Sequence, residues 1–159
     1  KMQVEAGARI VQIFDSWGGE LSPYDYERFC LPYLSRMVKE LHATGVPVIL
    51  FGVNMSNHLS LLKSTGADVI GVDWKMPIDE ARRILGNDVA VQGNLDPLHL
   101  FLPREELDAR VQDILRRAGA TGHIFNLGHG ILPPTDPEAA KFLVDAVHKH
   151  GAELLREGA

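Results

Sequence analysis

Hydrophobic positions along the chain gather into five short runs separated by stretches with helical periodicity. The runs predict five strands, at residues 9–14, 46–52, 68–73, 88–93 and 123–128. An amphipathic segment follows each strand, and right-handed crossovers between successive strands of this kind produce a parallel sheet. The pattern therefore predicts an α/β chain of repeated strand–helix units, with no linker that would divide it into domains.

Residues typical of helix termini mark the segments between the strands. Ser22 and Pro23 open a helix that Pro32 is expected to break or kink, and Asn57 is expected to cap another. The predicted helical segments are a helix tail within residues 1–8, a helix from residue 23, then 33–43, 58–64, 77–85, 98–101, 103–118 and 137–156, with Gly151 as a candidate interruption of the last.

The segment from residue 123 to residue 138 combines a strand, a glycine-flanked histidine and a helix start. The apolar run through Leu127 predicts a strand covered on both faces, and Asp136 and Pro137 suit the first positions of a helix. Between them lies Gly128-His129-Gly130, which presents an imidazole at the carboxyl end of a strand, where parallel α/β folds bind ligands. A functional role and a purely structural role for the histidine both fit these flanks.

Polar side chains follow the strand ends throughout the chain. Because the carboxyl ends of parallel barrel strands meet at one mouth, these residues are expected to share a rim. They are Asp15, Ser16, Asn54, Ser56, Asp73, Lys75, Gln92, Asn94, Asp96, Asn126 and His129. Asp96 precedes a proline, which favours a loop-capping role, whereas both readings stay open for Ser16. Trp17 and Trp74 are expected to pack beneath the loops, and Cys30 to lie in the core or an interface.

Composition and charge narrow the classes of partner. The 159 residues, 45% hydrophobic and 23% charged, suit one ordinary globular core. A formal charge of −5 gives no basic footprint for nucleic acid, and no apolar run approaches the ~20 residues that cross a bilayer. The first residues lack the apolar core of a signal peptide, and the single cysteine fits a reducing compartment. We therefore expect a cytoplasmic protein that binds neither nucleic acid nor membrane.

Common catalytic motifs are missing from the sequence. The seven histidines and one cysteine show no zinc-ligand spacing at a strand end, so no metal is expected. A triad could be assembled from Ser16, His129 and an aspartate, but no G-x-S-x-G elbow supports it. Neither a G-x-G-x-x-G nor a Walker sequence occurs. The residues alone predict part of a parallel barrel with a histidine at its mouth.

Five motifs in register carry the interpretation further. They are Gln12-Ile13-Phe14-Asp15-Ser16-Trp17-Gly18-Gly19, Leu50-Phe51-Gly52, Gly71-Val72-Asp73-Trp74, Val91-Gln92-Gly93-Asn94-Leu95-Asp96-Pro97 and Phe125-Asn126-Leu127-Gly128-His129-Gly130. In order and spacing they closely resemble the carboxyl-terminal part of the uroporphyrinogen decarboxylase family. The resemblance implies a TIM (β/α)8-barrel. This chain would hold its last five βα units, with residues 1–159 forming the carboxyl-terminal portion of a single domain.

The resemblance also implies an activity. The family decarboxylates the four acetate side chains of uroporphyrinogen III to give coproporphyrinogen III, without a cofactor, and the full-length protein is expected to be a homodimer. Position by position, His129 matches the active-site histidine and Ser16 a position that contacts the substrate. In the family, the arginines that bind the substrate's acids and the carboxylate that faces the pyrrole belong to the amino-terminal part. The chain alone is therefore expected to be inactive.

The sequence departs from the family pattern in one loop, and two alternative functions stay open. The family usually has a glycine-threonine-glycine turn and then an acidic residue after the second strand seen here, whereas this chain reads Val53-Asn54-Met55-Ser56-Asn57-His58. Zinc-dependent corrinoid methyltransferases of the same superfamily carry a His-x-Cys after that strand and a later Cys, and both are missing. The other alternative is a non-catalytic binding module, because five strands of a barrel leave two sheet edges open.

Overall fold

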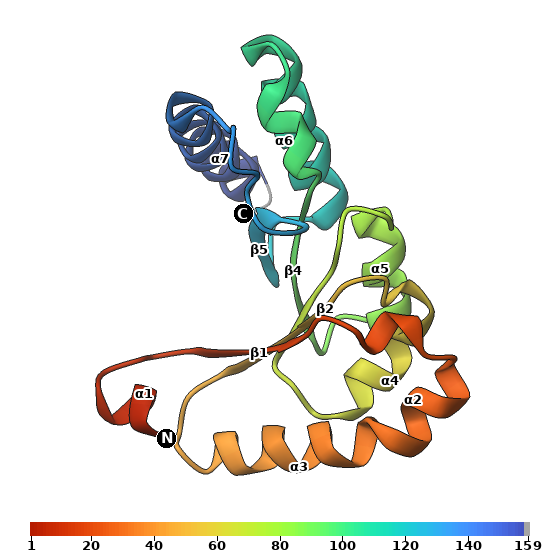
Figure 1. Cartoon of the computed structure of the whole chain (residues 1–159). Coiled ribbons are helices and arrows are strands. Elements are labelled where there is room, and N and C mark those ends of the chain that lie inside the picture. The colour runs from red at the N-terminus through yellow and green to blue at the C-terminus, as the bar shows by residue number, and fades with distance from the viewer. Residues whose placement is uncertain (158–159) are drawn as a thin grey trace.

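In the computed structural model, which describes residues 1–157, five parallel strands form one sheet in chain order (Figure 1). They are β1 (Val11–Asp15), β2 (Val48–Gly52), β3 (Val69–Gly71), β4 (Ala90–Leu95) and β5 (His123–Leu127). Every neighbouring pair is parallel, which confirms the predicted repeat of βα units. Within the described residues, β1 and β5 form the two edges of the sheet.

The connections between the strands are helical. Figure 1 shows them following the curved sheet, from α2 and α3 at one end to α6 and α7 at the other. Within residues 1–157, no helix has both the length and the apolar character needed to cross a membrane. The helical elements are α1 (Met2–Glu5), η1 (Gly18–Glu20), α2 (Pro23–Phe29), α3 (Leu31–His42), η2 (Ser56–His58), α4 (Leu59–Ser64), α5 (Ile78–Leu85), η3 (Pro97–Phe101), α6 (Arg104–Ala118) and α7 (Pro137–Glu157).

Several element boundaries differ from the predicted ones. β3 is shorter than residues 68–73, while β4 extends to Leu95 because its last residues pair with β5. Pro32 lies in the first turn of α3, where a missing N–H costs nothing, so the break between helices falls at Cys30. Asn57 caps no helix, since α4 begins after His58, and α7 continues through Gly151 without interruption.

Two apolar clusters attach the helices to one face of the sheet. The first lies between β1–β4 and α2–α5, with Leu50, Ile70 and Val91 fully buried on the sheet side. The partly buried Cys30 packs against it, as expected for a core position. The second cluster joins the ends of β4 and β5 to α6 and α7 around Val111. Because β4 contributes to both clusters, the helical layer is continuous along the sheet.

The opposite face of the sheet is largely open. Side chains alternate along β1, so that Ile13 faces the helices while Gln12 and Phe14 face the other way. The register pairs Phe14 with Phe51 on β2, and the two rings meet edge to face with centroids 6.1 Å apart. Phe14 is nevertheless 67% exposed. In a closed barrel this face would be the interior.

A histidine on α7 supports a pH-dependent contact with α6. His150 Nε2 lies 2.9 Å from Asp108 Oδ1, and the His150 side chain is only 12% exposed. The hydrogen bond to Asp108 raises the pKa of His150 above its ordinary value, and the same bond lowers the pKa of Asp108. A raised histidine pKa stabilises the fold below the unfolded-state value and loses that effect as pH rises through the folded-state value.

We therefore expect His150→Gln to cost about 0.5 to 1 kcal/mol of unfolding free energy at pH 5.5 and almost nothing at pH 8.5. Urea unfolding of both proteins at the two pH values measures the difference. His148→Gln is the matched control, because His148 is exposed on the same helix and should show no such pH dependence. An equal cost of His150→Gln at both pH values would refute the ion pair.

Candidate active site

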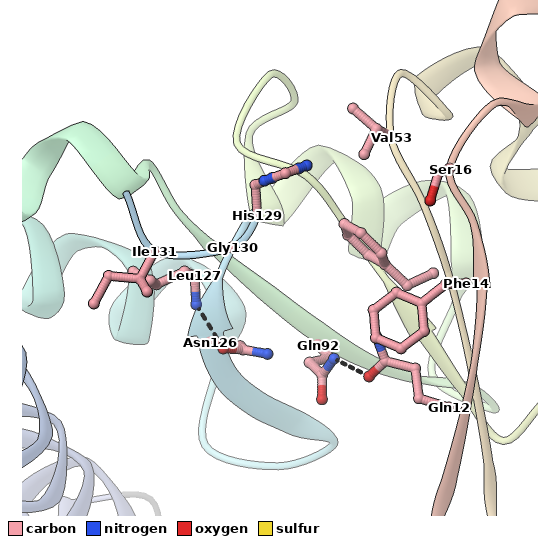
Figure 2. A pocket seen from close by; sticks show the side chains of 11 residues that line it. Gln12, Phe14, Ser16, Val53, Gln92, Asn126, Leu127, His129, Gly130 and Ile131 are labelled. Atoms are coloured by element: carbon pink, nitrogen blue, oxygen red, sulfur yellow. Dashed lines mark hydrogen bonds between the residues drawn. The ribbon is translucent and has the colours of Figure 1, made fainter. Parts of the chain in front are cut away.

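A hollow of about 500 Å³ lies on the open face of the sheet, toward the carboxyl ends of its strands (Figure 2). Its walls come from β1, β2, β4 and β5 and from the loops that follow β1, β2 and β5. The residues that line the hollow are Gln12, Phe14, Ser16, Phe51, Val53, Gln92, Asn126, Leu127, His129, Gly130 and Ile131. The structure thus brings together residues more than 100 positions apart in the chain, Ser16 and His129 among them.

His129 is an exposed residue in the loop after β5. Figure 2 shows its imidazole projecting over the hollow toward the side that carries Ser16 and Val53. Behind the histidine, the Gly128 N–H donates to the carbonyl oxygen of Leu95 over 2.7 Å. The imidazole also meets the Trp74 indole edge to face, with ring centroids 5.9 Å apart and an interplanar angle of 81°. The loop is therefore fixed against the ends of β3 and β4.

The two glycines beside His129 have different roles. A Cβ on Gly128 would clash with the backbone nitrogen of Trp74, so this close approach requires glycine. A Cβ on Gly130 would meet no heavy atom within 4 Å. Steric need therefore explains Gly128, whereas no close contact requires glycine at position 130.

Ser16 follows β1 on the other side of the hollow, where it is exposed. The preceding residue anchors its loop, because the Tyr26 hydroxyl donates to Asp15 Oδ2 over 2.9 Å. Tyr26 is fully buried, and burial together with the Asp15 carboxylate raises the pKa of its phenol. Gly18 approaches the same carboxylate so closely that a Cβ would clash with it. Asp15 therefore supports the Ser16 loop rather than facing the hollow.

Two residues expected beside Ser16 and His129 at the rim lie beneath it instead. Asp73 is 3% exposed and Asn94 7% exposed, and neither lines the hollow. Their polar groups hold loop backbone in place, as expected of buried groups that must be hydrogen bonded. Of the eleven residues expected to share the rim, four line the hollow: Ser16, Gln92, Asn126 and His129.

Other polar residues at the strand ends also divide into lining and supporting groups. Gln92 lines the hollow and donates through Nε2 to Gln12 Oε1 over 3.0 Å (Figure 2). Asn126 also lines the hollow, and its Oδ1 accepts a hydrogen bond from the backbone N–H of Leu127. Asp96 accepts from the Leu98 N–H over 2.9 Å, which confirms its expected role as a cap.

The two tryptophans do not behave alike. Trp17 was expected to pack beneath a loop, but it is 79% exposed because its neighbours turn into η1 and leave the indole outside. Trp74 is partly buried and contacts His129, so it belongs to the surroundings of the site rather than to general packing.

The lining residues define what the hollow can do chemically. They include one imidazole, one hydroxyl and three side-chain amides, together with an aromatic wall, but no carboxylate, lysine or arginine. Within residues 1–157, no three His, Cys, Asp or Glu residues gather as a metal site would require. The hollow can exchange a proton through His129 and hydrogen-bond a polar ligand that also presents apolar surface.

Fold and site together define this chain as a portion of a parallel β/α barrel with a histidine-bearing site at the carboxyl ends of its strands. The model of the uroporphyrinogen decarboxylase (URO-D) family matches residues 1–150, and the chain belongs to that family. It is 81% identical over 158 residues to a uroporphyrinogen decarboxylase of Myxococcus xanthus, a match that covers 99% of this chain and 45% of the relative.

Other comparisons agree. A uroporphyrinogen decarboxylase of Streptomyces coelicolor is 52% identical over 149 residues, which cover 93% of this chain and 42% of the relative. The chain thus spans less than half the length of these relatives. A solved methyltransferase from Methanosarcina mazei superposes with a TM-score of 0.81 at 24% identity, over 92% of this chain and 43% of that one. An archaeal fructose 1,6-bisphosphate aldolase gives 0.60 at 18% identity, over 93% and 61%. These two structures bear on the fold, and the barrel prediction is confirmed.

Proposed function

We propose that residues 1–159 are the carboxyl-terminal portion of a single barrel domain that decarboxylates the four acetate side chains of uroporphyrinogen to give coproporphyrinogen. The observation that carries this proposal is the 81% identity to a decarboxylase so named, in a chain whose hollow is walled by His129 and Ser16. No cofactor is required in this proposal, because the substrate itself can accept the electrons that decarboxylation releases.

The reaction needs two proton transfers to carbon. Protonation of the pyrrole ring carbon next to the one that bears the acetate arm creates an iminium-like cation, and the electrons of the breaking C–C bond flow into it as carbon dioxide leaves. A second proton then converts the exocyclic methylene into a methyl group, and loss of the first proton from the ring carbon restores the pyrrole. We assign proton donation, or the fixing of the reacting carboxylate, to His129, because an imidazole can both donate and accept a proton. Ser16 is assigned to substrate binding.

The hollow suits part of such a substrate. Phe14 and Phe51 offer an apolar wall to a macrocycle, and Gln12 and Gln92 offer amide groups to its acids. An octa-acid also requires several cations, which the lining residues of this chain do not provide. We assign those cations, and the carboxylate that stabilises the pyrrolic cation, to the rest of the barrel beyond β1 and β5.

Three further properties belong to the proposal. The full-length protein is a homodimer, it acts in the cytoplasm, and its partner is a tetrapyrrole rather than a nucleic acid or a membrane. The acidic balance of the chain, with 21 Asp and Glu against 16 Lys and Arg, supports the exclusion of nucleic acid.

The methyltransferase alternative lacks an observation in its favour. The similarity to the Methanosarcina mazei structure, at 24% identity, concerns the fold alone. The loop after β2 contains no His-x-Cys, and the single cysteine, Cys30, lies between α2 and α3. Against a non-catalytic binding module stands the 81% identity to a relative named as a decarboxylase.

A chimera tests the proposed function. We define the completed protein as this chain joined to the portion of the Myxococcus xanthus relative that it does not cover. Incubation with uroporphyrinogen, followed by chromatography of the oxidised porphyrins, is expected to show coproporphyrin at a rate comparable to that of the relative itself. Elemental analysis of the active protein should find no stoichiometric zinc. A soluble, folded chimera without decarboxylation, or one that binds zinc stoichiometrically, would contradict the proposal.

A further inference from the structure

We propose that Trp74 is a positioning residue for His129. In this proposal the indole fixes the orientation of the imidazole over the hollow, and the buried Asp73 carboxylate fixes the indole. The inference rests on the proposed function in one respect, because it takes His129 as the residue whose orientation matters for turnover. Its structural part stands on contacts between side chains and can be measured separately.

Aromatic contact is what orients the imidazole. His129 is exposed, and within residues 1–157 its ring contacts the Trp74 indole edge to face. A histidine on a loop surface would otherwise exchange among rotamers. The edge-to-face contact with Trp74, at 5.9 Å between centroids, has the geometry that stabilises aromatic pairs, and it should favour one rotamer of His129 several-fold.

The backbone on both sides of Trp74 is fixed by buried polar groups. The Asp73 carboxylate accepts one hydrogen bond from the Lys75 N–H over 2.9 Å and another from the Asn54 N–H over 2.6 Å. The Asn94 amide donates to the Asp73 carbonyl oxygen over 2.8 Å and to a second carbonyl oxygen, two residues beyond the tryptophan, over 2.6 Å. Four hydrogen bonds therefore hold the turn that presents the indole.

The indole is also held through its own face and through its backbone. The Lys75 ammonium lies 5.4 Å from the ring centroid of Trp74 and is hydrogen bonded to Asn54 Oδ1. Gly128 packs directly on the Trp74 backbone, so the loop that carries His129 and the loop that carries the indole lie at a fixed separation. The position of the imidazole is thus defined relative to β3 as well as to β5.

A positioning role predicts an effect on the chemical step. Proton transfer to carbon depends on the direction of the donor, and misplacement by about 1 Å can cost on the order of 100-fold in rate. Substrate affinity depends mainly on groups elsewhere in the site. Loss of the indole should therefore lower kcat and leave KM nearly unchanged.

Two substitutions of Trp74 in the completed protein test this expectation. Trp74→Leu should lower kcat by about 10- to 100-fold with KM changed less than about threefold, whereas Trp74→Phe, which retains an aromatic ring, should recover most of the rate. NMR of histidine-labelled protein, with the His129 signals identified from the His129→Asn spectrum, should show the ring-current shift of the imidazole protons lost in Trp74→Leu.

The glycines supply a matched pair for the same NMR measurement. Gly128→Ala should displace the His129 ring signals and lower kcat, because its methyl group would meet the Trp74 backbone, whereas Gly130→Ala should leave those signals in place. If Trp74→Leu is folded and leaves both kcat and the His129 signals unchanged, the positioning role is refuted. If the completed protein lacks decarboxylase activity, the proposed function fails, and the NMR comparison still decides whether Trp74 orients His129.

Discussion

Replacing His129 with asparagine in the completed protein is expected to lower kcat for uroporphyrinogen decarboxylation by about 10²- to 10⁴-fold. Asparagine retains a polar group of similar reach but cannot donate and recover a proton near neutral pH. The fold should survive, because His129 is exposed and belongs to neither apolar cluster. Initial rates at saturating substrate, together with circular dichroism, measure both parts of the prediction.

The matched control for this substitution is His148→Asn. His148 is an exposed histidine on α7 and does not line the hollow, so the same chemical change there should leave kcat within about twofold. A His129→Asn protein that removes all four acetate carboxyl groups at the normal rate would mean that the histidine between the two glycines is structural.

Much of the fold could be predicted from the sequence because the signals are local. Apolar runs such as Val48–Gly52 predict buried strands by themselves, and their alternation with amphipathic helices limits the sheet to a parallel order. The ends of β3 and β4 could not be predicted in this way. They depend on pairing across the sheet, since Leu95 is a strand residue only because it lies opposite Leu127.

Only part of the candidate site could be predicted from the sequence. Ser16 and His129 follow strands and line the hollow as predicted, but Asp73 follows a strand too and is buried beneath the loops. Sequence position does not say whether a polar side chain faces the hollow or the neighbouring backbone. Gln12 and Phe14 were missed as lining residues, although the period-two alternation within β1 carries the signal that places them on the open face.

The tryptophans illustrate the same limit. Trp17 and Trp74 each follow an acid at a strand end by one or two residues, and the sequence gives no reason to separate them. Whether each indole is buried or exposed depends on which loop lies against it at the rim. Gly128 brings the loop after β5 against Trp74, whereas the backbone after Trp17 turns away into η1. Short-range sequence patterns do not predict contacts between loops that lie far apart in the chain.

The second large effect is the inactivity that we expect of the isolated chain. The isolated chain is expected to show no appreciable decarboxylase activity, because its hollow lacks lysine, arginine and carboxylate side chains and is open on the side away from the helices. Within residues 1–157, strands β1 and β5 present unpaired edges, and Phe14 is 67% exposed beside one of them. Closing the ring would bury this surface and pair the edge backbone groups. The chain should therefore associate with a partner that supplies the remaining strands.

Mixing this chain with the separately produced remaining portion of the Myxococcus xanthus relative, then assaying coproporphyrinogen formation, tests the central claim most directly. We predict no product from either piece alone, a stable complex by size-exclusion chromatography, and activity that appears only in the mixture. The same mixture made with the His129→Asn chain should form the complex and remain at least about 100-fold slower. Robust activity from residues 1–159 alone, or a complex whose activity does not depend on His129, would contradict the account.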